Sequence, residues 1–139
     1  MPAVRTCVTF HCPHFNITVD EPYFINPGNF GDDLLRALLP GLSARGLEII
    51  GDPFQEDYGW VQAFLRDERN YHLAAGFRPE DRQWLIWVEP EKRTAPEVPW
   101  ILHAVLLDLP GVRDIRWHHQ EDFDAGNEDA GAAEPSSLG

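Results

Sequence analysis

Apolar and polar residues alternate along several stretches of the chain, which is the pattern of a half-buried β-strand. Val8, Phe10 and Cys12 share one face of a first predicted strand over residues 4–12. A similar alternation predicts a second extended piece at residues 15–19. Short polar turns separate three later strands, which therefore form an antiparallel meander. The later strands are predicted at residues 47–50, 60–66, 71–77, 84–88 and 112–117.

Two other stretches carry apolar residues at helical spacing. Five leucines between residues 34 and 42 predict a helix over 29–45, with Asn29 as its N-cap. Pro40 lies inside this helix and predicts a kink or a break, because proline lacks the backbone N–H of a helical hydrogen bond. A second helix is predicted to begin near Thr94, because Thr94 and Glu97 match the capping-box spacing, and to end before residue 110.

The predicted elements follow one another as two strands, a helix, four strands, a helix and a strand. This order predicts an α+β fold: a mainly antiparallel sheet of five to seven strands with two helices packed on one face. Both faces of the strand at 84–88 are apolar, so we expect part of the second sheet face to be covered or contacted. Residues 1–120 form a single domain. Residues 121–139 can bury little apolar surface and are predicted to be an acidic disordered tail.

The composition supplies enough core material for a domain of 139 residues, with five Trp, eight Phe and three Tyr. Cys7 and Cys12 lie about 16 Å apart if the strand between them is extended, which excludes a disulfide within that strand. Secretory signals are not visible, and no apolar stretch approaches the ~20 residues that span a bilayer. We therefore expect a cytoplasmic protein without a membrane segment.

The formal net charge of −12 narrows the class of partners. Residues 1–120 hold 11 basic and 17 acidic side chains, so the predicted domain is acidic even without its tail. A chain of this charge is repelled by phosphate backbones, which makes nucleic acid an unsuitable ligand. A basic protein partner is the natural electrostatic complement.

Histidines and cysteines near the N-terminus offer one alternative site. His11, Cys12 and His14 could bind a metal or serve an enzyme, with His118 and His119 as distant additions. However, His11 and Cys12 point to opposite faces of an extended strand, and their spacing matches no standard zinc motif. The sequence also lacks the common nucleophile, phosphate-loop and zinc-protease motifs. We therefore expect no cofactor and no catalytic residues.

Acids and aromatic residues adjoin in a predicted loop over residues 51–58. Asp52, Glu56 and Asp57 precede Tyr58, and a second pair, Trp87 and Glu89, lies in the strand at 84–88. If Trp84 faces the helices, Trp87 faces away from them. Aromatic rings beside carboxylates suit an Arg- or Lys-rich partner through ion pairs and cation–π contacts. The predicted partner-binding residues are Asp52, Glu56, Asp57, Tyr58, Trp87 and Glu89.

Three short elements of the sequence are G-D-D-L at 31–34, R-G-L at 45–47 and E-D-Y-G-W at 56–60. Their order resembles that of a group of small uncharacterised bacterial proteins, in which a helix leads through R-G-[LI] to an E-[DE]-[WY]-G-W element. The resemblance covers roughly residues 30–117. It implies a bacterial origin and no catalytic residues. By size, charge and fold class the chain also resembles bacterial immunity proteins, which block a toxin by binding it.

Three functional hypotheses follow. The first is a non-enzymatic acidic binding protein, an inhibitor or immunity protein, that docks a basic protein partner. The second is a metal-dependent or histidine-using enzyme centred on His11, Cys12 and His14. The third is a homo-oligomeric structural or assembly subunit. Across the three hypotheses, the chain is expected to be a monomer or a homodimer.

Overall fold

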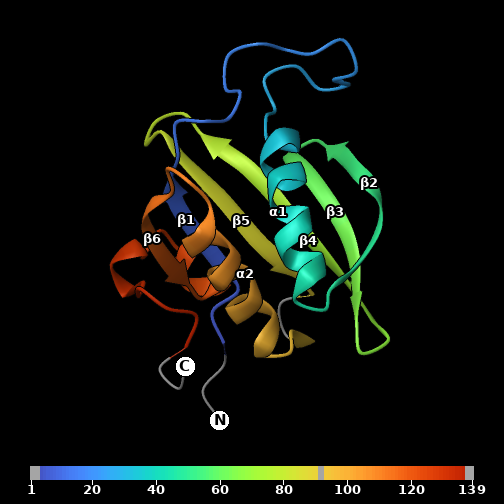
Figure 1. Ribbon diagram of the computed structural model, residues 1–139. Helices are drawn as coiled ribbons and strands as arrows, with labels where there is room; N and C mark the ends of the chain where they lie inside the picture. The colour runs from blue at the N-terminus through green and yellow to red at the C-terminus, as the bar shows by residue number, and fades with distance from the viewer. Residues whose placement is uncertain (1–3, 91–92, 137–139) are drawn as a thin grey trace.

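The computed structural model describes residues 4–90 and 93–136. Within these residues, six strands form one sheet in the order β2-β3-β4-β5-β1-β6, and neighbouring strands are antiparallel (Figure 1). This arrangement confirms the predicted α+β fold with a mainly antiparallel sheet of five to seven strands. The strands are β1 Cys7–His11, β2 Glu48–Glu56, β3 Gly59–Arg66, β4 Arg69–Arg78, β5 Gln83–Glu89 and β6 Arg113–His118.

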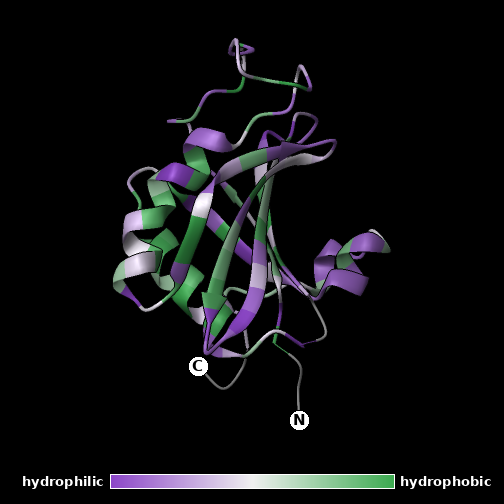
Figure 2. Cartoon of the chain, turned by 90° about the vertical axis from the view of Figure 1, so that its right-hand side faces the viewer, coloured by the Kyte–Doolittle hydropathy of each residue, from purple (hydrophilic) through white to green (hydrophobic). Residues whose placement is uncertain are grey.

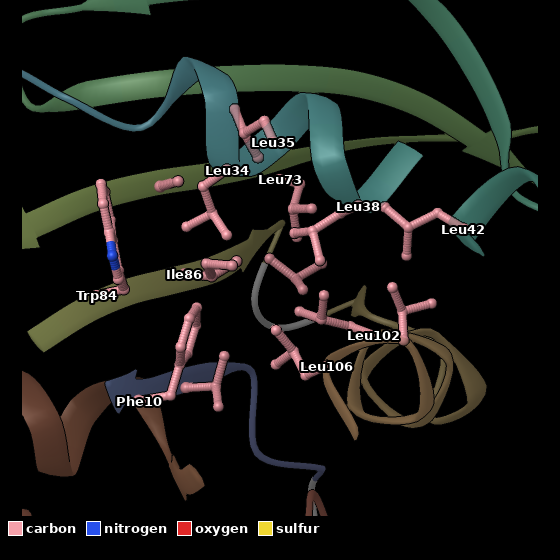
Figure 3. Packing of buried hydrophobic residues seen from close by; sticks show 14 of the residues in the cluster. Phe10, Leu34, Leu35, Leu38, Leu42, Leu73, Trp84, Ile86, Leu102 and Leu106 are labelled. Carbon is pink, nitrogen blue, oxygen red and sulfur yellow. The ribbon is translucent and has the colours of Figure 1, made fainter. Parts of the chain in front are cut away.

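Two long helices, α1 (Asp32–Ala44) and α2 (Glu97–Asp108), pack on one face of the sheet, which we term the inner face (Figure 1). The register places Val8 opposite Ile86 and Ile86 opposite Ala75, so alternate residues of β1, β5 and β4 share this face. Leucines of both helices pack onto these residues (Figure 3). The core labelled there consists of Phe10, Leu34, Leu35, Leu38, Leu42, Leu73, Trp84, Ile86, Leu102 and Leu106.

The ends of the two helices differ from the prediction. Helix α1 begins after Gly31, because the side-chain amide of Asn29 donates instead to the carbonyl of Asp57 at 2.9 Å. The helix also continues through Pro40 to Ala44, so the predicted break does not occur. At α2, the Thr94 hydroxyl donates to the carbonyl of Pro90 at 2.7 Å and no side-chain cap is formed.

The predicted strand at 15–19 is wrong: residues 12–31 form a long loop at one end of the sheet (Figure 1). Asn16 explains the difference, because its side-chain oxygen accepts the backbone N–H groups of Thr18 and Val19 at 3.1 and 3.0 Å. Such local bonds turn the chain and compete with pairing in a sheet. Further along, the Phe24 ring lies 5.4 Å from the Trp60 ring and attaches the loop to the sheet.

Strand β2 is longer than the predicted strand at 47–50 and includes most of the predicted loop. The pairing between β2 and β3 shifts register between Ile50 and Phe54, which accommodates Gly51 and Pro53 within a paired strand. Only Asp57 and Tyr58 then remain in the turn to β3. The acidic segment is therefore an edge strand with a tight turn.

Residues 120–136, the C-terminal segment, differ from the predicted disordered tail. They contain a short helix α3 (Gln120–Asp124) and a 3-10 helix, η2 (Glu128–Ala130), and they lie on the sheet face opposite α1 and α2 (Figure 2). Ala132 exchanges two backbone hydrogen bonds with Trp117, at 2.6 and 2.8 Å. Backbone pairing of this kind needs little apolar area, so the composition did not reveal it. Residues 137–139 of the predicted tail lie outside the described residues.

Arg78 at the end of β4 connects this segment to the sheet. Its guanidinium lies 3.0 Å from the carboxylate of Glu128 and 5.0 Å from the centre of the Phe123 ring. The same side chain pairs with Asp81 at 3.1 Å. Because these contacts are charge-assisted and partly buried, Arg78 contributes more to the position of the segment than an exposed ion pair would.

Replacing Arg78 by glutamine should loosen the C-terminal segment while the sheet stays folded. We expect hydrogen exchange at the amides of Trp117 and Ala132 to become about tenfold faster, which corresponds to about 1.4 kcal/mol of local opening. The control is Arg69→Gln, which removes an exposed arginine at the other end of β4. Equal exchange rates in the two variants would contradict this role of Arg78.

Candidate functional site

The sheet face opposite the two long helices, the outer face, is only half covered. The C-terminal segment covers the side formed by β1 and β6, where Cys7, Thr9 and His118 are buried. On the side formed by β2 to β4, apolar side chains reach the surface: Ile50 is 43% exposed and Phe54 is 40% exposed. The uncovered half of the outer face is therefore an apolar surface next to solvent.

Tyr58 and Trp87 form an aromatic pair on this surface, although 29 positions separate them in the sequence. Their ring centroids lie 5.5 Å apart with an interplanar angle of 40°. Tyr58 comes from the turn between β2 and β3, and Trp87 comes from the middle of β5. Their approach depends on glycine: the carbonyl of Tyr58 lies over Gly76, where a Cβ would be 3.1 Å from that oxygen.

Two carboxylates accompany the aromatic pair. Burial together with the negative charges of Glu89 and Glu56 raises the pKa of Tyr58 above its usual value of 10. The tyrosine is therefore a neutral hydroxyl at physiological pH, held close to two acids. We define the aromatic–acidic patch as Phe54, Glu56, Tyr58, Trp87 and Glu89. Such a group offers a cation both aromatic ring faces and opposite charge.

Four of the six predicted partner-binding residues meet in this patch: Glu56, Tyr58, Trp87 and Glu89. Asp57 lies beside them in the exposed turn. Asp52 does not join them, because its carboxylate points toward helix α1, 3.9 Å from the guanidinium of Arg36.

Sequence reasoning missed Phe54, because the residues around it were predicted to form a loop. The ring of Phe54 lies 6.1 Å from the ring of His72 on the outer face. The signal that could have found it is the alternation of Ile50 and Phe54 once the register shift is recognised.

The alternative metal site is not formed. His11 pairs with Asp114 at 3.0 Å, whereas the Cys12 thiol donates to the carbonyl of Pro110 at 3.6 Å and the His14 ring lies against Gly111. Within residues 4–90 and 93–136, no three His, Cys, Asp or Glu side chains converge as metal ligands would. His11, Cys12 and His14 therefore do not converge as metal ligands in this part of the chain, and the hypothesis of an enzyme centred on them stays a prediction.

Cys7, the other cysteine of the chain, lies beneath the C-terminal segment. Burial, with a smaller contribution from the charge of Asp124, raises the pKa of this thiol to about 12. The reactive form of cysteine is the thiolate. At neutral pH the Cys7 side chain is therefore protonated and behaves as a core residue.

Two buried histidines form hydrogen bonds with neighbouring side chains inside the protein. Nδ1 of His103 on α2 accepts the indole N–H of Trp117 on β6 at 3.0 Å, and Nε2 of His118 lies 3.1 Å from the hydroxyl of Thr9. Burial lowers the pKa of both His103 and His118 below the usual 6.5. Both rings are therefore neutral at pH 7, and His103 is an acceptor only in that form.

Comparisons with protein-family models, with curated proteins and with solved structures find no match to this chain. The resemblance to small bacterial proteins with the E-D-Y-G-W element therefore stays a prediction. Among the residues that the structure describes, no helix combines the length and the apolar character that crossing a membrane requires.

Proposed function

We propose that this chain is a non-enzymatic binding protein that docks a basic protein surface on its aromatic–acidic patch. One observation carries the proposal: the Tyr58 and Trp87 rings lie 5.5 Å apart on the uncovered half of the sheet, with two carboxylates beside them. Tyr and Trp are the side chains that most often dominate protein interfaces, since they bring large areas at a low entropic cost.

The charge of the whole chain supports the same partner class. A net charge of −12 attracts a basic protein from a distance, and the patch supplies the short-range contacts. Glu56 and Glu89 are half-buried at the rim of the aromatic pair, where an incoming cation is partly shielded from water. A cation–π contact of this kind contributes about 0.5–2 kcal/mol, depending on its exposure.

Within this class we favour an inhibitor that neutralises a basic bacterial toxin in the cytoplasm. The size, acidity and α+β fold of the chain are those of immunity proteins, so this step is an analogy. It also explains why a small domain would keep aromatic rings at its surface, because tight inhibition requires buried anchor residues in the interface.

The proposal is tested with an acetylated peptide in which Arg and Lys alternate with Ser, titrated into the full chain by calorimetry. We expect binding that weakens as salt rises, since part of the attraction is screened. The double variant Tyr58→Ala/Trp87→Ala should weaken binding by at least about tenfold, because it removes both ring faces. A wild-type chain that does not bind the basic peptide would overturn the proposal.

A charge-matched pair of variants separates the patch from the overall charge. Glu56→Gln/Glu89→Gln and Asp52→Asn/Asp108→Asn each remove two negative charges. Asp52 pairs with Arg36 of helix α1 and Asp108 pairs with Arg45 directly after that helix, so the second variant leaves the patch unchanged. We expect a clear loss of affinity for the first variant and a loss of less than about twofold for the second. Equal losses would mean that net charge alone attracts the peptide.

A further inference from the structure

A hollow adjoins the aromatic–acidic patch on the other side of Trp87. It has a volume of about 370 Å³ and lies between β5 and the C-terminal segment. Trp87 and Glu89 line it from β5, and Gln120 and Asp124 line it from α3. The side-chain N–H of Gln120 donates to Asp124 at 2.8 Å, which holds the two α3 side chains together.

The chemistry of this lining is that of a cation site with a flat wall. An indole ring forms one side, and carboxylates from two different elements, Glu89 and Asp124, stand around it. Within the described residues, neither carboxylate takes part in an ion pair of the chain. A ligand that enters can therefore pair with both of them.

We propose that this hollow receives the guanidinium group of an arginine side chain from the docked protein, in preference to a lysine ammonium. The inference rests on the proposed function, because the arginine belongs to the basic surface that the patch binds. It adds a specific pocket and a specific side chain to that surface.

Three features favour arginine. A guanidinium is planar, so it stacks on the Trp87 ring, whereas an ammonium approaches the ring as a point charge. Its five N–H donors form a fork, which can donate hydrogen bonds to Glu89 and Asp124 at the same time. The side-chain oxygen of Gln120 is a further acceptor, while the amide nitrogen of the same side chain donates to Asp124.

The chain holds one of its own arginines in the same manner nearby. The guanidinium of Arg78 lies 5.0 Å from the centre of the Phe123 ring and 3.0 Å from the carboxylate of Glu128. The C-terminal segment thus already combines an aromatic ring with an acid around an arginine. The hollow beside Trp87 repeats this combination with Glu89 and Asp124, but no arginine is among the described residues that line it.

The test uses three otherwise identical lysine-rich peptides whose central residue is arginine, lysine or citrulline, titrated into the full chain by calorimetry. We expect the arginine peptide to bind about tenfold more tightly than the other two. Free arginine should bind at least about a hundredfold more weakly than the arginine peptide, because it lacks the patch contacts. Free arginine that binds as tightly as the peptide would overturn the assignment to a protein side chain.

A variant pair locates the preference in the hollow. Asp124→Asn should reduce the arginine-over-lysine ratio to about twofold, and its unfolding midpoint is measured to show that the fold is intact. Glu121→Gln removes the same charge from an exposed position of α3 outside the hollow and should keep the full ratio.

The outcomes separate the two proposals. Equal, measurable affinities for the arginine and lysine peptides would refute the guanidinium site and leave the binding function standing. Failure of all three peptides to bind would refute the binding function itself. A tenfold preference that persists unchanged in Asp124→Asn would place arginine recognition elsewhere on the patch.

Discussion

Replacing Gly59 by alanine is expected to destabilise the protein by about 3 kcal/mol or more. Gly59 has a φ of 148°, and a Cβ at this position would overlap the backbone carbonyl of Ala75 in the neighbouring strand β4. A backbone oxygen cannot turn away as a flexible side chain can, so β3 and β4 would have to separate. Because the core packs on this part of the sheet, the separation would cost core contacts as well.

Gly51→Ala is the matched control for this prediction. Gly51 also has a positive φ, of 68°, but no atom lies within 4 Å of an added Cβ. The control therefore isolates the cost of the backbone conformation alone, which is about 1–2 kcal/mol. The free energy of unfolding of both variants is measured by urea denaturation. Similar values for Gly59→Ala and Gly51→Ala would show that the approach of β3 to β4 is not close enough to matter.

The second large effect is a loss of stability in mild acid. Burial holds the pKa values of His103 and His118 below 6.5, so the unfolded chain binds more protons than the folded chain as the pH falls through that value. The stabilisation is therefore fully present above about pH 6.5 and decreases as the pH falls toward the folded-state pKa values. Protonated His103 also loses the lone pair that accepts the Trp117 indole N–H. We expect the urea midpoint to fall between pH 7 and pH 5.

Glutamine variants test the assignment to these two histidines. His103→Gln/His118→Gln keeps an acceptor near Trp117 but cannot titrate, so its midpoint should change much less between pH 7 and pH 5. His103→Leu should instead cost about 1–3 kcal/mol at pH 7, because it leaves the indole N–H of Trp117 buried without a partner. An unchanged pH slope in the glutamine double variant would assign the acid sensitivity to other groups.

The sequence predicted the strands of the meander and both long helices, because their apolar periodicity is set by burial on one face. It failed where local side-chain bonds override that periodicity. At Asn16, an alternating stretch became a turned loop because one side chain accepts two backbone N–H groups. At residues 120–136, pairing of Ala132 with Trp117 and of Glu128 with Arg78 ordered a segment with few apolar residues.

Part of the candidate site could be predicted as well, because it depends on strand alternation and on composition. The alternation in β5 indicated which way Trp87 faces, and composition indicated the acids near Tyr58. That Tyr58 reaches Trp87 could not be predicted, since it depends on Gly59 and Gly76 allowing a close backbone approach between strands. Asp52 was misplaced because the register shift in β2 sends its side chain toward Arg36.

The pairing of Ala132 with Trp117 also limits aggregation through an open edge of the sheet. The outermost strands of this sheet are β2 and β6, and an open strand edge is a template for aggregation. Strand β2 carries a register shift, Pro53 and exposed acids, which discourage a second chain from pairing there. Strand β6 has part of its edge occupied by the chain's own residue 132. The C-terminal segment thus blocks the pairing of another chain with the edge of β6. A protein shortened before Gln120 would expose that edge to other copies of the chain in concentrated solution.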